Sequence, residues 1–124
     1  MSGPTVIFLS SAGWEARYQA VTLGITAAAL GDPVTLVLSF EPLRAFVAGT
    51  FDEGAPPTAP AAKVPPLSET LAEARRDLGL RVVACETAVR LAGLEPAAAR
   101  AALDALEPIP SLWRLAQGGR ALAF

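Results

Sequence analysis

The chain contains no histidine and only one cysteine, and these two shortages exclude most of the familiar catalytic and metal sites. Without histidine there is no Ser–His or Cys–His catalytic pair and no histidine ligand for a metal. One cysteine forms no internal disulfide and supplies too few thiolates for a zinc or iron–sulfur site in one chain. The sequence also lacks the G-x-G-x-x-G and G-x-x-x-x-G-K-[ST] phosphate-binding motifs. We therefore expect no metal and no cofactor.

The chain also has no large excess of positive or negative charge and no long apolar run. The 124 residues carry a net charge of −2 and the sequence pI is about 5.0, so we expect no binding to nucleic acid or to an anionic membrane surface. No apolar run approaches the roughly 18 residues that a membrane helix requires. Residues 1–4 run into an apolar strand without the pattern of a signal peptide. We expect a cytoplasmic protein with one domain over residues 1–124.

Short apolar segments alternate with helical ones along the chain. Residues 5–10 and 34–39 are β-branched and continuously apolar, as in strands covered on both faces. Further strands are expected at residues 80–84 and 120–124, with a brief, proline-broken fourth strand within 106–110. Helices are expected over residues 15–30, 41–49, 68–78, 86–91, 97–106 and 111–117. This order predicts an α/β fold, a single-domain flavodoxin-like parallel sheet of four to five strands with helices on both faces.

Residues 50–67 form a proline-rich loop, because Pro56, Pro57, Pro60, Pro65 and Pro66 rule out regular structure over most of the segment. Two interpretations stay open. The segment is a mobile surface loop, or it is a lid or subunit contact, as long loops in compact domains sometimes are.

In a parallel sheet the loops that follow the strands gather at one edge, where ligands and reactive groups lie. Three such loops carry polar or small residues here, namely Ser10, Ser11 and Gly13 after the first strand, Ser39 after the second, and Cys85 after the third. Ser10, Ser11 and Ser39 fit turn formation about as well as ligand binding. We expect all three loops to converge on one binding site.

Cys85 lies where the third strand meets a helix. The positive end of the helix dipole and the free N–H groups of Thr87 and Ala88 favour the thiolate, which is the nucleophilic form of cysteine. The alternative is that Cys85 is packed as a small apolar residue. Glu86 opposes a second anion, but an acid in the first helical turn also compensates the dipole, and we favour that role. Arg17 or Arg44 could approach the site from the loops, which helical phase alone does not decide, and we favour surface solvation for each.

The chain resembles the DsrE/DsrF-like family of sulfur-relay proteins over nearly its whole length. The resemblance rests on the segments Val6–Gly13 and Ser39–Glu41, on Val82-Val83-Ala84-Cys85 with its helix up to Leu94, and on the final strand Ala121–Phe124. It implies that Cys85 carries sulfur as a persulfide. It also implies donor and acceptor proteins as partners, and a homo-oligomer (dimer, trimer or hexamer).

Three functions remain open from the sequence. The first is a sulfur carrier or sulfurtransferase that uses Cys85 as the catalytic residue, with Ser10, Ser11, Gly13, Ser39, Glu86 and Thr87 around it. The second is a non-catalytic binding or assembly module of the same fold, in which Cys85 is inert. The third is a small-ligand-binding flavodoxin-like protein, which the absence of a phosphate-binding loop disfavours.

Overall fold

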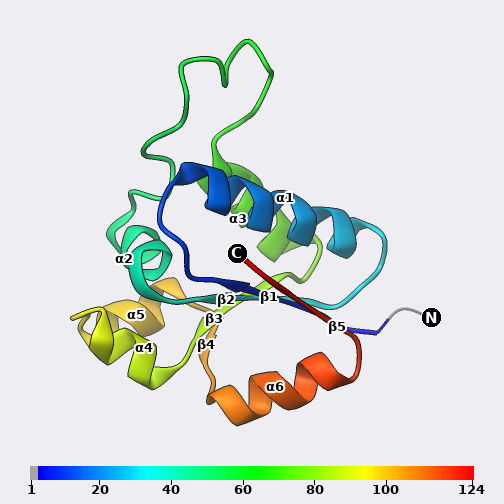
Figure 1. The fold of residues 1–124 in the computed structure, drawn as a ribbon, viewed down its shortest axis with the longest axis vertical. Helices are drawn as coiled ribbons and strands as arrows, with labels where there is room; N and C mark the ends of the chain where they lie inside the picture. The colour runs from blue at the N-terminus through cyan, green and yellow to red at the C-terminus, as the bar shows by residue number, and fades with distance from the viewer. Residues whose placement is uncertain (1–2) are drawn as a thin grey trace.

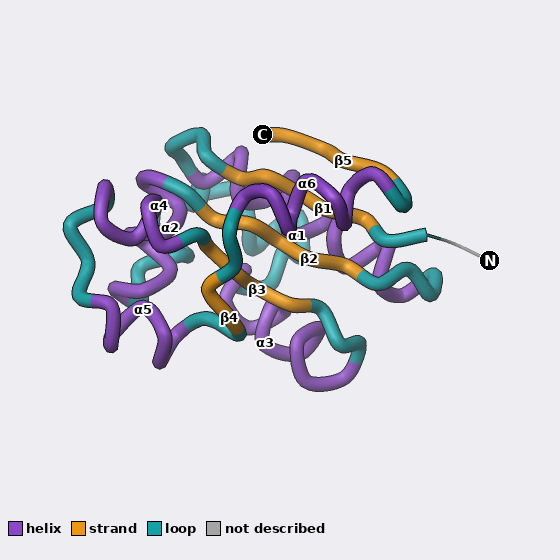
Figure 2. Tube along the Cα trace, turned by 90° about the horizontal axis from the view of Figure 1, so that it is seen from below, coloured by secondary structure: helices purple, strands orange, loops and turns teal. Residues whose placement is uncertain are grey.

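The computed structural model describes residues 3–124 and contains one five-stranded sheet in which every paired strand is parallel. The strand order is β4-β3-β2-β1-β5, which Figure 2 shows from below. The α/β architecture predicted from the alternation of segments is thus confirmed, with the larger of the two expected strand numbers.

The strands are β1 (Thr5–Leu9), β2 (Val34–Leu38), β3 (Arg81–Ala84), β4 (Ala105–Leu106) and β5 (Arg120–Ala123). The helices are α1 (Trp14–Ala29), α2 (Phe40–Ala48), α3 (Leu67–Asp77), α4 (Glu86–Leu91), α5 (Pro96–Ala102) and α6 (Ile109–Gln117).

Successive strand residues point to opposite faces of the sheet, so each central strand contributes to two apolar layers. On one face Ile7, Leu36 and Val82 pack with buried residues of α1 and α3. On the other face Val6, Val37 and Val83 pack against α6. Figure 1 shows α1 and α3 above the sheet and α6 below it. Helices therefore cover both faces, which explains why β1 and β2 read as continuous rather than alternating apolar runs.

Two boundaries differ by more than two residues from those that the sequence predicts. The helix expected over residues 97–106 ends at Ala102, because Leu103 is extended (φ −94°, ψ 157°). The next residue, Asp104, accepts a hydrogen bond from the Val82 N–H at 2.7 Å, which draws the chain alongside β3. The fourth strand is accordingly Ala105–Leu106. Residues 109 and 110, expected within that strand, open α6 instead, with proline in the first turn, where its missing N–H costs nothing.

The remaining helices lie at one end of the sheet (Figure 1). The short helices α2 and α4 each follow a strand directly, and α5 follows α4, so all three lie toward the carboxyl ends of the strands, on the left in Figure 1. The proline-rich loop projects away from the sheet, beyond α1 and α3 (Figure 1). Within residues 3–124, no helix has the length and apolar character needed to cross a membrane.

Candidate functional site

Cys85 joins the end of β3 to the start of α4, as the sequence predicts. Its backbone is extended (φ −90°, ψ 156°) and occupies the N-cap position of α4. Its Sγ atom accepts a hydrogen bond from the backbone N–H of Ala88 at 3.3 Å. The residue is half-buried, so the sulfur is anchored to the first turn of the helix without being enclosed in the core.

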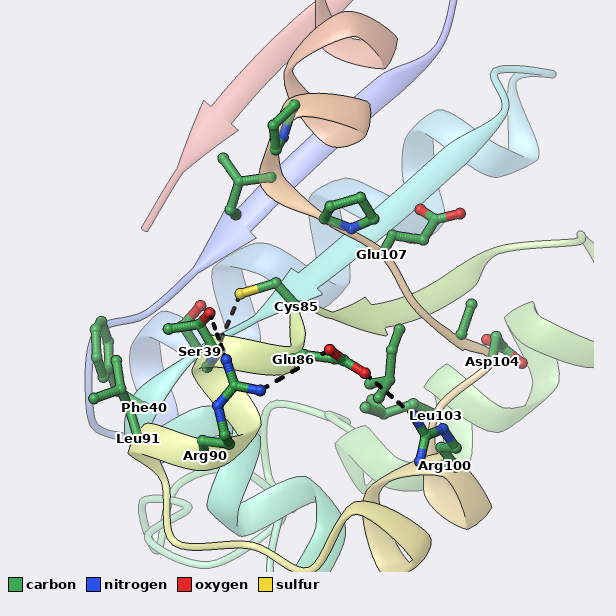
Figure 3. A pocket seen from close by; sticks show the side chains of 17 residues that line it. Ser39, Phe40, Cys85, Glu86, Arg90, Leu91, Arg100, Leu103, Asp104 and Glu107 are labelled. Atoms are coloured by element: carbon green, nitrogen blue, oxygen red, sulfur yellow. Dashed lines mark hydrogen bonds and ion pairs between the residues drawn. The ribbon is translucent and has the colours of Figure 1, made fainter.

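An open cavity of about 1050 Å³ lies beside Cys85 and is as large as pockets that hold drug-sized ligands. Figure 3 shows the side chains that line it. They come from the start of α2, from α4, from the last part of α5 and from the chain that runs through β4 into α6. The cavity thus lies at the carboxyl ends of β2, β3 and β4, where this class of fold binds ligands.

Glu86 lies between two arginines at the wall of the cavity. Its carboxylate is 3.3 Å from the Arg100 guanidinium and 3.9 Å from that of Arg90. Arg90 also donates a hydrogen bond to the Thr87 Oγ1 at 3.3 Å. Because two guanidinium groups flank one carboxylate, the negative charge next to Cys85 is compensated locally. Glu86 and Thr87 both line the cavity, and Glu86 also occupies the first turn of α4, in keeping with the expected dipole role.

Ser39 and Phe40 form the opposite part of the rim. Ser39 takes the N-cap position of α2 and donates its backbone N–H to the Leu9 carbonyl at 3.0 Å. Phe40 has a φ of 55°, a left-handed conformation that is uncommon for a bulky residue, and its side chain is 49% exposed. The strained backbone directs an apolar ring to the mouth of the cavity instead of into the core.

Arg17 lies behind this rim and is 4% exposed, so the assignment to surface solvation is wrong. It forms an ion pair with Glu41 in the first turn of α2 and donates hydrogen bonds to the carbonyls of Phe51 (3.4 Å) and Glu53 (2.9 Å). Within the described chain, Arg17 Nε and Glu41 Oε2 are buried without a hydrogen-bond partner. Arg17 therefore links α1 to the first turn of α2 through Glu41, and to the chain that follows α2 through Phe51 and Glu53. These contacts fix the position of α2, which begins with Phe40.

The loop after β1 does not reach the cavity. Of the described residues that line the cavity, none belongs to residues 10–13. Ser10 and Ser11 instead donate their backbone N–H groups to the Phe124 carbonyl at 2.9 and 3.2 Å, which fastens the end of β5. Gly13 starts α1 with a φ of 101°, a left-handed value that favours glycine. Two of the three expected loops, those with Ser39 and Cys85, therefore meet, and the third has a turn-forming role.

Several residues that line the cavity were not predicted from the sequence. Arg90, Leu91 and Arg100 lie on α4 and α5, and the segment from Leu103 to Pro110 closes one side. The alternation of strands and helices identifies strand ends, but it does not indicate which later helix folds back over them. The one usable signal was a single acid, Glu86, followed by the arginines Arg90 on α4 and Arg100 on α5. No group of three or more potential metal ligands occurs within the described residues.

Comparison with known proteins gives a likeness of fold. No family model matches the sequence, and no curated protein matches it either. Among solved structures, the chain is similar to the ychN protein from E. coli, with a TM-score of 0.65 and 16% sequence identity over 98% of this chain and 99% of that one. At this identity the likeness shows a shared fold, and it supports the fold expected from the DsrE/DsrF-like resemblance.

Proposed function

We propose that the protein is a sulfur carrier of the DsrE/DsrF-like type, which takes a sulfane sulfur onto Cys85 as a persulfide and passes it on. The observation that carries the proposal is the position of Cys85, which is half-buried in the wall of an open cavity at the carboxyl ends of the strands. A lone cysteine packed in the core would have no route for a donor.

The proposed sulfur transfer requires neither an oxidant nor a cofactor. The Cys85 thiolate attacks the outer sulfur of a donor persulfide, the sulfur–sulfur bond of the donor breaks, and the donor leaves as a thiolate. An acceptor thiolate then attacks the outer sulfur on Cys85 and releases the Cys85 thiolate. The N–H of Ala88, 3.3 Å from Sγ, donates to the sulfur that acts as nucleophile and later as leaving group.

The rim of the cavity supports proteins as donor and acceptor. Three large apolar side chains at the cavity are well exposed, namely Phe40 (49%), Leu91 (67%) and Ile109 (50%). Exposed apolar groups that gather at one opening are typical of surfaces that bind other proteins. The same rim fits the second function left open by the sequence, an assembly module with an inert Cys85, so a chemical test has to separate the two. A cytoplasmic location, where thiols stay reduced, belongs to this proposal.

Loading with glutathione persulfide, followed by intact-protein mass spectrometry, tests the proposal. We expect wild-type protein to gain the mass of one sulfur atom, and the Cys85→Ser variant to gain none. The matched control is Ser39→Ala, which changes a cavity-lining hydroxyl and leaves the thiol in place. If wild-type protein stays unmodified while the same donor loads a small thiol, the carrier proposal fails and the assembly module stands.

A further inference from the structure

We propose that the Cys85 cavity selects its donor by apolar contact. The donor is a protein cysteine persulfide with an apolar side chain next to the cysteine, and Phe40 is the residue that recognises this side chain. The proposal rests on the proposed function and adds to it the chemical character of the donor. Three features of the cavity support it: its charges are paired, its thiol faces Phe40, and Phe40 is held at its mouth.

The charged side chains that line the cavity all have partners within the protein. Their ion pairs are 2.8–3.9 Å long, namely Glu86 with Arg90 and Arg100, Asp104 with Arg75, and Glu107 with Arg81. A charged donor would have to displace one of these partners, and exchanging one solvated ion pair for another gains little free energy. The charges of the cavity therefore provide little affinity for a charged donor.

The Cys85 side chain points away from most of these charges. In Figure 3 its sulfur lies toward Phe40, whereas Asp104 and Glu107 lie on the other side of the cysteine. The hydrogen bond from the Ala88 N–H, 3.3 Å from Sγ, fixes this direction. The part of a donor next to its reacting sulfur therefore meets the apolar part of the rim.

Phe40 is held at the cavity mouth by its backbone. Its φ of 55° is unfavourable for a bulky residue, and such a conformation persists only where the neighbouring contacts impose it. On one side the Ser39 N–H binds the Leu9 carbonyl at 3.0 Å, and on the other Glu41 pairs with the buried Arg17. The ring stays 49% exposed, so the strain does not serve the core. Backbone strain of this kind is typical of residues that contact a ligand.

Leu91 and Ile109 extend the apolar rim, with exposures of 67% and 50%. Among the described residues, the side chains that pack on the core include neither of them, nor Phe40. Pro108 and Pro110 also line the cavity and have no backbone N–H to offer. The cavity of about 1050 Å³ is far larger than a persulfide group, so it has room for the residues beside a donor cysteine.

Alkylation of Cys85 by two uncharged maleimides measures the apolar preference without any sulfur transfer. N-benzylmaleimide carries an aromatic ring, and N-(2-hydroxyethyl)maleimide carries a small polar group. Each rate constant is divided by that for a small neutral thiol, which removes the intrinsic reactivity of the reagent. Because covering an aromatic ring is favourable, we expect wild-type protein to prefer the benzyl reagent about tenfold.

Three variants connect this preference to the rim. We expect Phe40→Ala to reduce the ratio to about two and Leu91→Ala to reduce it to about five, because each removes part of the apolar contact. Trp113→Ala is the matched control, since it removes an aromatic ring that is 60% exposed and does not line the cavity. Far-UV circular dichroism establishes that the variants fold. A wild-type ratio near one, or a ratio that Phe40→Ala and Leu91→Ala leave unchanged, would overturn the proposal.

The persulfides of two capped, uncharged peptides, Leu-Cys-Leu and Ser-Cys-Ser, test the donor itself. We expect the leucine peptide to load Cys85 about tenfold faster in wild-type protein, and Phe40→Ala to remove most of this advantage. Loading from both peptides at equal rates would overturn the donor preference alone. No loading from either peptide, while both load a small thiol, would overturn the carrier function and the donor preference together.

Discussion

At the scale of single residues, two side chains matter most for the site: Cys85, which caps α4 at the cavity, and Arg17, which is buried behind its rim. Cys85 was predictable because a strand-like run ends at Ala84 and a helix-like run begins at Glu86, and the boundary between them needs only local pattern. Arg17 was not predictable in the same way. Its helical position is shared with apolar neighbours, but its partners Glu41, Phe51 and Glu53 lie far along the chain, and only the fold brings them together.

The charge balance around Glu86 leads to a kinetic prediction. Replacing both Arg90 and Arg100 by alanine leaves the carboxylate beside Cys85 uncompensated, which disfavours the approach of an anionic persulfide. Because exposed charge pairs are worth about 0.2–1 kcal/mol, we expect the loading rate at constant pH to fall roughly two- to fivefold. Adding Glu86→Gln to the double variant should restore the rate, measured by quenched mass spectrometry. A double variant as fast as wild type would refute this role.

The buried ion pair of Arg17 leads to a stability prediction. Arg17→Met leaves the partly buried Glu41 carboxylate and two carbonyls without their donor. Loss of one partner of a buried pair costs about 3–5 kcal/mol, and we expect about 3 kcal/mol because the Glu41 side chain is 31% exposed. Urea denaturation measures the loss. The control is Arg44→Met on exposed α2 surface, with an expected change within about 0.5 kcal/mol. Similar losses for both variants would contradict the account.

At the scale of elements, the apolar pattern of the sequence was enough to predict the strands β1 to β3 and the long helices. It was not enough to predict the boundaries in the region after α4. Strands β1 and β2 are covered on both faces, so their runs of Val, Ile and Leu are unambiguous. Strand β4 has two half-buried residues and little pattern of its own. Its place is set by Asp104, which binds both Val82 N–H (2.7 Å) and Arg75 on α3 (2.8 Å), contacts that sequence patterning does not contain.

Asp104 should make stability depend on pH. Burial alone raises the pKa of this carboxyl, but hydrogen bonds from Arg75 and from the Val82 N–H outweigh it and lower the pKa below its ordinary value of 3.8. The stabilisation is therefore complete above the unfolded pKa and is lost as pH falls through the lower folded pKa. We expect Asp104→Asn to destabilise the protein at neutral pH and to approach wild-type stability near pH 2. Parallel melting curves for the two proteins at all pH values would contradict this assignment.

Helix α6, which packs on the second face of the sheet, provides a packing prediction. Leu112 of α6 is fully buried against Val6, Val37 and Val83. Leu112→Ala leaves a cavity under the helix that covers this face, and we expect a loss of about 3 kcal/mol in the free energy of unfolding. Arg114→Ala on the exposed side of the same helix is the control, with little expected change. A loss below about 1 kcal/mol for Leu112→Ala would mean that α6 packs loosely.

At the scale of the whole molecule, the parallel sheet was predictable and the cavity was not. The alternation of strands and helices fixes which loops lie at the carboxyl edge, and the loops with Ser39 and Cys85 do meet there. The other wall is built by α5, β4 and the start of α6, and this segment is held at that edge by long-range contacts, namely the burial of Ala99 and Leu103 in the core and the hydrogen bond between Asp104 and the Val82 N–H. The ychN protein has a similar fold at 16% identity, so very different sequences are compatible with this architecture.

A carrier has to unload as well as load, so single-turnover transfer is the most direct measure of the central claim. Protein loaded on Cys85 and freed of donor is mixed with an excess of a thiol acceptor, and intact mass is followed with time. We predict that the added sulfur leaves wild-type protein and appears on the acceptor in equal amount, with the Cys85 thiol restored. An adduct that stays on the protein, or sulfur that binds equally well to the Cys85→Ser variant, would contradict the account.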